Sequence, residues 1–220
     1  MEVKFNPKIH NRKSVRLIAH DYGEPGLYFI TICSKSRKNL FGKIINYEMI
    51  LSDIGKIIQK EWEATKNIRS NVDLDEYIVM PNHLHGIIEI KYNRRGVWQY
   101  APTDENHQRR GVLPYAPTNE NKFQSPSHTL GSIVRGFKAS ATKQVNKYLN
   151  SPDAGPIWQR NYHDHIIANE NSYNKIADYV YNNPASWESD LNNLNFINKV
   201  PIKEREKLIQ EHYADLFGVT

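Results

Sequence analysis

The stretch from Val72 to Lys91, VDLDEYIVMPNHLHGIIEIK, contains two runs rich in apolar and β-branched residues, separated only by a Pro-Asn dipeptide. Proline and asparagine are typical turn residues, so the stretch predicts two neighbouring strands. Side chains two positions apart in a strand point to the same side of a sheet. His83 and His85 are therefore expected to share one face at the start of the second strand.

Two converging imidazoles can bind a divalent metal ion, although a histidine in a strand is often an ordinary hydrogen-bonded core residue. His163 and His165 form a second pair with the same spacing. A leucine inside the first pair would put the other side of its strand into a core, whereas an aspartate inside the second pair indicates a solvated side. Because a buried strand holds ligands more rigidly, we favour His83 and His85 as metal ligands and assign His165 a supporting or structural role.

The rest of the chain predicts an alternation of strands and helices. GLYFITICSKSR, at 26–37, has the composition of a strand, and a small hairpin that turns near Asn46 precedes a helix capped by Ser52. Further predicted elements are a basic amphipathic helix over 129–149, a strand over 157–169, a helix over 170–183 that ends before Pro184, and a final amphipathic helix over about 201–216. This order predicts an α+β protein with a ferredoxin-like or RRM-like split βαβ antiparallel sheet, helices on one face, and an additional C-terminal helix.

The length of 220 residues, of which 39% are hydrophobic, is sufficient for one domain with an adequate core. RRGVWQYAPTDENHQ, at 94–108, is followed at once by RRGVLPYAPTNENKF, at 109–123, which is a 15-residue tandem duplication. Two copies are too few for a repeat fold. We expect a single domain over 1–220, with a largely disordered loop at about 92–127 and a C-terminal tail from about 191.

Charge and cysteine content restrict the class of protein. The formal net charge of +5 and the pI of about 9.1 permit nucleic-acid binding without requiring it. Cys33 is the single cysteine, which excludes an internal disulfide and fits a reducing compartment. No apolar run reaches the roughly 18 residues of a membrane helix, and the segment 1–16 is too polar for a signal peptide. We expect a cytoplasmic protein.

The predicted helix over 170–183 has a phenol and an amide on one face. Tyr179 and Asn183 are four residues apart, and thus about 40° from each other around the helix axis. Tyr181 points about 160° away from Asn183 and cannot share a site with it. One face would thus present an amide oxygen to a metal and, a turn earlier, a phenol. A tyrosine packed in the core and an asparagine that caps the helix end are the ordinary alternative.

Several separate motifs in one order give a more specific signal. GLYFITIC is followed by MPNHLHGI, RGFK, IWQRNYHDHII and DYVYNNP, and together these motifs resemble the REP-associated branch of the HUH single-tyrosine transposases over about 11–190. The resemblance implies the HUH endonuclease fold. It also implies that His83 and His85 are the HUH histidines, that Tyr179 is the nucleophile, and that Asn183 is the third metal ligand.

The same resemblance implies a transposase-type endonuclease and strand transferase. Such an enzyme cleaves and rejoins single-stranded, hairpin-associated DNA through a 5′-phosphotyrosine intermediate. The metal is expected to be Mg²⁺ or Mn²⁺, and two imidazole ligands favour Mn²⁺. A monomer is expected rather than a homodimer. The duplicated loop and the segment beyond Asp190 depart from the family pattern.

Basic and aromatic residues outside the metal site are candidates for contacts with DNA phosphates and bases, with a structural role as the ordinary alternative for each. The candidates are Arg12, Lys13, Arg16, Arg135, Lys138, Trp158 and Arg160. Two functions from other classes remain open. One is a metal-dependent phosphohydrolase that uses the histidines but not the tyrosine, and the other is a non-catalytic RRM-like nucleic-acid-binding domain.

Overall fold

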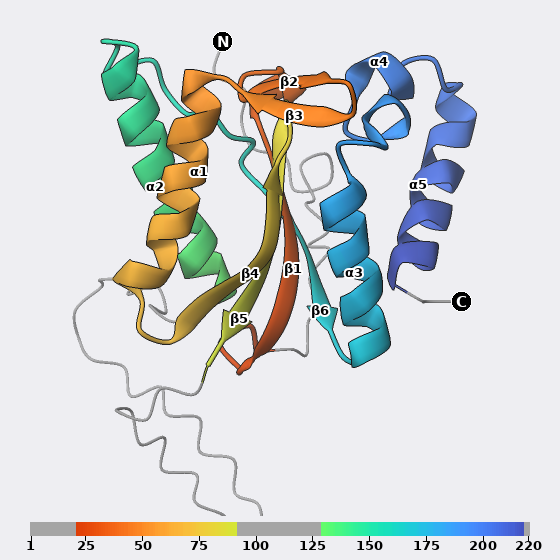
Figure 1. The fold of residues 1–220 in the computed structure, drawn as a ribbon, viewed down its shortest axis with the longest axis horizontal. Coiled ribbons are helices and arrows are strands. Elements are labelled where there is room, and N and C mark those ends of the chain that lie inside the picture. The colour runs from red at the N-terminus through yellow and green to blue at the C-terminus, as the bar shows by residue number, and fades with distance from the viewer. Residues whose placement is uncertain (1–20, 92–128, 218–220) are drawn as a thin grey trace, which may run out of the picture.

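The computed structural model describes residues 21–91 and 129–217 (Figure 1). The loop expected at about 92–127 lies outside the described residues, as do the candidate DNA contacts Arg12, Lys13 and Arg16. The elements that position the candidate site all lie within the two described ranges.

Four strands form a central antiparallel sheet in the order β4-β5-β1-β6 (Figure 1). Their bounds are Gly26–Cys33 for β1, Val72–Val79 for β4, His83–Ile90 for β5 and His163–Ile167 for β6. β5 lies between β1 and β4, and β1 lies between β5 and β6. Each βαβ unit is thus split by one antiparallel strand, which confirms the α+β class and the split βαβ sheet predicted from the order of elements.

The other elements of the described residues are five α-helices, a small second sheet and two 3-10 helices, η1 at Lys35–Arg37 and η2 at Trp187–Ser189. The helices are α1 at Asp53–Ile68, α2 at Leu130–Tyr148, α3 at Glu170–Asn182, α4 at Leu194–Ile197 and α5 at Ile202–Phe217. The second sheet pairs β2 at Gly42–Ile45 with β3 at Glu48–Leu51. Within the described ranges, no helix combines the length and the apolar composition needed to cross a membrane.

Local chemistry explains where several of these elements begin and turn. The Ser52 side chain accepts a hydrogen bond from the backbone N–H of Gly55, and this capping bond fixes the start of α1. Asn169 caps α3 in the same way. Asn46 and Tyr47 have φ angles of 50° and 64°, which is the backbone geometry of a tight hairpin turn between β2 and β3.

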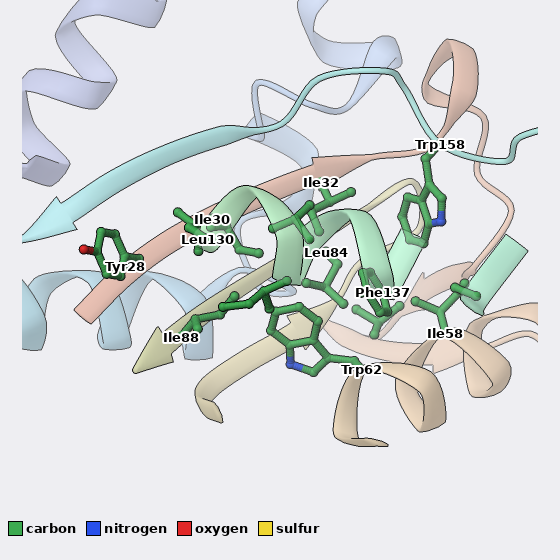
Figure 2. Packing of buried hydrophobic residues seen from close by; sticks show 14 of the residues in the cluster. Tyr28, Ile30, Ile32, Ile58, Trp62, Leu84, Ile88, Leu130, Phe137 and Trp158 are labelled. Carbon is green, nitrogen blue, oxygen red and sulfur yellow. The ribbon is translucent and has the colours of Figure 1, made fainter. Parts of the chain in front are cut away.

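Helices α1 and α2 cover one face of the sheet (Figures 1 and 2). Leu84 and Ile88 of β5 form a buried cluster there with Trp62 of α1 and Phe137 of α2. Gly86 lies on the same strand beside Trp62, and a Cβ at this position would stand 2.6 Å from the indole ring. The absence of a side chain at Gly86 therefore allows the indole to lie against the sheet.

Helices α3 and α5 cover the opposite face of the sheet (Figure 1). A second buried cluster joins the sheet to these helices, and its members are Phe29, Ile87, Ile167, Ile176, Val180 and Leu216. The expectation of helices on one face holds for α1 and α2, whereas α3 and the C-terminal helix lie on the other face. The physical reason is that β5 is buried on both sides, and such a strand requires cover on both faces.

Candidate active site

Strand β5 places two imidazoles side by side on the face covered by α3. Leu84 is fully buried in the cluster with α1 and α2, so its neighbours in the strand point the other way. The rings of His83 and His85 have centroids 4.4 Å apart and an interplanar angle of 72°. Both side chains are almost completely inaccessible. The two-residue spacing in the strand therefore produces a close, buried histidine pair.

Asn82 determines which nitrogen of His83 faces the site. The Nδ2 group of Asn82 donates to the carbonyl oxygens of Arg37 and Asn192, so its Oδ1 is the atom that lies 2.8 Å from His83 Nδ1. An amide oxygen only accepts, so Nδ1 of His83 carries the proton and Nε2 keeps its lone pair. This Nε2 atom is buried and has no hydrogen-bond partner.

His85 is held between two side chains. Its Nδ1 lies 2.8 Å from the hydroxyl oxygen of Thr31 in the neighbouring strand β1. Its Nε2 lies 3.3 Å from the phenol oxygen of Tyr179. A hydrogen bond to one ring nitrogen fixes the orientation of the ring and presents the other nitrogen to a ligand. His85 is therefore oriented toward the same space as His83 Nε2.

Burial keeps both imidazoles neutral. It lowers the pKa of His83 to about 3, and the positive charge of Arg37 acts in the same direction, opposed by the Asn183 side chain. Burial also lowers the pKa of His85, and the neighbouring His83 adds to this effect. A neutral imidazole is the form that binds a metal ion, because a lone pair is available. Near pH 7 both rings are therefore in the ligating form.

Helix α3 brings Tyr179 to the histidines and directs Tyr181 away from them. The Tyr179 ring lies 5.1 Å from the ring of His85 and packs edge-on against Phe29. Tyr181 is 77% exposed, as the helical spacing predicted. Burial raises the pKa of Tyr179, and the negative charge of Asp190 raises it further. The phenol is therefore protonated in this state of the protein.

Asn183 directly follows the last residue of α3 and is 1% exposed. Its Nδ2 group donates to Oδ2 of Asp190 over 3.2 Å. Its Oδ1 atom is buried and, like Nε2 of His83, has no hydrogen-bond partner. Buried polar atoms without partners are costly, and a bound cation would interact favourably with both of these lone-pair donors. The donor set of two imidazole nitrogens and one amide oxygen fits a divalent metal ion.

Asp190 is a site residue that the sequence interpretation did not single out. One carboxylate oxygen of Asp190 and one nitrogen from each of His83 and His85 lie within 4.8 Å of one another. Asp190 is 6% exposed and lies in the loop that follows α3. It belongs to no periodic pattern, and an aspartate in a polar loop usually faces solvent. Nothing in the sequence alone therefore distinguished it from other loop carboxylates.

The C-terminal helix also reaches the site. The ring of His212 lies 5.5 Å from the ring of Tyr179 in an edge-on arrangement. The ring of His165 stacks on Phe217 of α5 with centroids 3.7 Å apart. This packing is the kind of supporting role expected for His165. The segment expected as a tail from about 191 thus contains a helix that packs beside Tyr179.

The described DNA-contact candidates separate into two groups. Arg135 and Arg160 are exposed, on α2 and on the segment before β6. Trp158 is 4% exposed and packs between the rings of Phe41 and Phe137, so its expected role in stacking on bases is corrected to a core role.

Lys138 requires a similar correction. Its ammonium group donates to the backbone carbonyl oxygens of Gln159 and Asn161 over 3.0 and 2.9 Å. Burial lowers the pKa of Lys138 to about 8. The side chain therefore ties the segment before β6 to α2, and it is not directed toward a phosphate in solvent.

Comparisons with known proteins identify one related chain and two similar structures. No family model matches the chain. An uncharacterized protein of Haemophilus influenzae is 42% identical over 190 residues, which cover 86% of this chain and 97% of that protein.

Two solved structures are more distantly similar. One is a REP-associated tyrosine transposase bound to a REP hairpin, with a TM-score of 0.48 and 18% identity over 80% of this chain and 74% of that one. The other is a protein from Deinococcus radiodurans R1 provisionally described as a transposase, with a TM-score of 0.39 and 13% identity over 78% of this chain and 97% of that one.

Proposed function

This chain belongs to the same family as the uncharacterized Haemophilus influenzae protein, and we propose that it is a single-tyrosine transposase that cleaves and rejoins single-stranded DNA at hairpins. The observation that carries the proposal is the contact of 3.3 Å between the Tyr179 phenol oxygen and Nε2 of His85. It brings the nucleophile implied by the sequence motifs to the histidine pair implied by the same motifs. Asn183 adds a buried amide oxygen to this group.

The proposed reaction is a transfer of a phosphoryl group to tyrosine. The Tyr179 oxygen gives up its proton and attacks the scissile phosphorus, the bond from phosphorus to the 3′ oxygen breaks, and the leaving 3′ oxygen takes up a proton. The products are a 5′-phosphotyrosine and a strand that ends in a 3′-hydroxyl. The ester keeps the energy of the broken bond, so a 3′-hydroxyl can attack it and rejoin a strand without ATP.

His83, His85 and Asn183 are the residues that would hold Mg²⁺ or Mn²⁺ in this proposal. When bound, the ion would supply positive charge for the phosphate oxygens and for a phenolate. The chain itself orients the tyrosine, because His85 and Phe29 both contact its ring. Burial raises the pKa of the Tyr179 phenol, so the phenol is protonated before an ion and a DNA strand bind.

The proposed partner is single-stranded DNA with a hairpin, bound by a monomer. Arg135 and Arg160 are exposed cations outside the metal site. Contacts between such arginines and DNA phosphates neutralise phosphate charge and make the affinity for DNA dependent on salt concentration. Arg12, Lys13 and Arg16 remain candidates for phosphate contacts because their side chains are basic.

The test is a covalent-adduct assay with the full chain, Mn²⁺ and a labelled single-stranded hairpin DNA, separated on a denaturing gel. We expect the wild-type chain to form a protein–DNA adduct and Tyr179→Phe to form none. Tyr181→Phe is the matched control, because this exposed tyrosine lies two residues away on the same helix. Its adduct should equal that of the wild type.

The same reactions, run on a denaturing gel and on a native gel, distinguish the other functional classes. Cut DNA without an adduct would indicate a metal-dependent phosphohydrolase. A shifted but intact DNA on a native gel, with no cleavage under denaturing conditions, would indicate a binding domain. An adduct that persists in Tyr179→Phe would contradict the proposed nucleophile.

A further inference from the structure

Asp190 connects the loop after α3 to the proposed ligands. A carboxylate only accepts hydrogen bonds, so the Asn183 amide must turn its Nδ2 group toward Asp190. The orientation of an amide is otherwise ambiguous, because its oxygen and nitrogen ends have similar shapes. The contact with Asp190 therefore leaves Oδ1 of Asn183 as the end without a partner. The Asn183 side chain lies close enough to His83 to affect the pKa of its imidazole.

Asp190 is itself fixed by its own loop. Its Oδ1 accepts a hydrogen bond from the backbone N–H of Asn192. The loop is anchored to the sheet side by Arg37, which donates to the carbonyl oxygen of Leu191 over 3.0 Å. It is anchored again by Asn82, which donates to the carbonyl oxygen of Asn192 over 2.8 Å. The carboxylate is therefore held in place by the backbone around it.

Asn82 joins this loop to the other side of the site. The Asn82 side chain, which donates to the loop through Nδ2, also accepts a hydrogen bond from Nδ1 of His83 through Oδ1. A continuous hydrogen-bonded path thus runs from His83 through Asn82, Asn192 and Asp190 to Asn183. Two of the three proposed ligands are oriented by the same network, although they lie on different elements and a hundred residues apart.

Charge gives Asp190 a second effect. His83, His85 and Asn183 are neutral ligands, so a buried divalent ion among them would keep its full charge, which is costly away from water. Arg37 adds a positive charge close enough to lower the pKa of His83. Within the part of the chain that the structure describes, Asp190 is the carboxylate found together with the two histidines.

We propose that Asp190 is the positioning residue of the metal site, which turns the Asn183 oxygen toward the histidines and offsets part of the charge of the ion. This inference rests on the proposed function only in taking His83, His85 and Asn183 as metal ligands. It assigns Asp190 no role in the chemistry of the DNA.

The test measures Mn²⁺ affinity of the full chain without DNA, from the electron paramagnetic resonance signal of free Mn²⁺. Loss of a residue that orients a metal ligand typically weakens metal binding about tenfold to a hundredfold, and we expect a loss of this size for Asp190→Asn. Asp215→Asn is the matched control. Asp215 is exposed on α5, so its variant removes the same charge without altering the network and should bind Mn²⁺ as the wild type does.

A second variant, Asp190→Glu, separates the position of the carboxylate from its charge. Asp190→Glu keeps the carboxylate but displaces it by one methylene group from Asn183 and Asn192, so Mn²⁺ binding should again weaken. Far-UV circular dichroism and thermal unfolding without metal identify the folded variants. Wild-type Mn²⁺ affinity in a folded Asp190→Asn or Asp190→Glu chain overturns the inference.

The outcomes of this test and of the adduct assay are independent. If Asp190→Asn loses Mn²⁺ affinity while the wild-type chain forms no DNA adduct, the inference stands and the proposed function fails. If the wild type forms an adduct and Asp190→Asn binds Mn²⁺ normally, the proposed function stands and the inference fails.

Discussion

The phenol oxygen of Tyr179 lies 3.3 Å from Nε2 of His85, although the two residues are 94 positions apart in the chain. Helix α3 and strand β5 each supply one partner, and the contact exists only because α3 packs on the face of the sheet opposite α1 and α2. This single relationship turns two separate sequence motifs into one site.

Replacement of Tyr179 by phenylalanine should separate activity from stability. The aromatic ring and its edge contact with Phe29 remain, so only the hydroxyl hydrogen bond is lost. A single hydrogen bond contributes about 0.5 to 1.5 kcal/mol, and the free energy of unfolding in urea should fall by no more than this. A larger loss would mean that the phenol is mainly a structural group.

Leu84 should behave as the anchor of the histidine strand. Its side chain projects from β5 and is fully buried against α1 and α2. Loss of a buried leucine side chain costs about 2 to 5 kcal/mol. Leu84→Ala should lower the free energy of unfolding by that amount in a denaturant titration. Ile68→Ala is the control, because Ile68 is 73% exposed, and its variant should change stability by less than about 1 kcal/mol.

The buried histidines should make the protein less stable in mild acid. Burial lowers the pKa of His83 from 6.5 to about 3, so between these values the unfolded chain binds a proton that the folded chain does not. The contribution of His83 to the free energy of unfolding therefore has its full value above pH 6.5 and decreases as the pH falls toward 3. For His83 alone the loss between pH 7 and 5 is about 2 kcal/mol.

The pH effect is measured by urea unfolding at several pH values without metal. His83→Gln should flatten the dependence of the unfolding free energy on pH. His163→Gln is the comparison, because burial lowers the pKa of His163 as well, but less than that of His83, so its variant should change the slope less. Equal slopes in the wild type and His83→Gln would contradict a neutral buried imidazole at position 83.

Arg160 and Lys138 should affect different properties. Arg160 has an exposed side chain, so Arg160→Ala should weaken binding of single-stranded hairpin DNA and reduce the slope of log affinity against log salt by about 0.7. Lys138→Met removes the bonds to Gln159 and Asn161, so it should lower the unfolding free energy while the salt slope stays unchanged. Fluorescence anisotropy at several salt concentrations measures the slopes. The reverse pattern would restore Lys138 as a phosphate contact.

The sequence by itself determined the relationships that lie within one element. The two-residue period of a strand put His83 and His85 on one face, and the helical period put Tyr179 and Asn183 on one face with Tyr181 turned away. The order of strands and helices also predicted the split βαβ sheet. These are consequences of local backbone geometry, which neighbouring residues fix.

The tertiary structure alone decided the relationships between elements. It placed α3 and α5 on the second face of the sheet, buried Trp158, tied Lys138 to a backbone segment and brought Asp190 to the histidines. None of these follows from periodicity, because each depends on contacts between residues that are far apart in the chain. Packing of both sheet faces and pairing of buried polar groups select among many arrangements that local geometry allows equally.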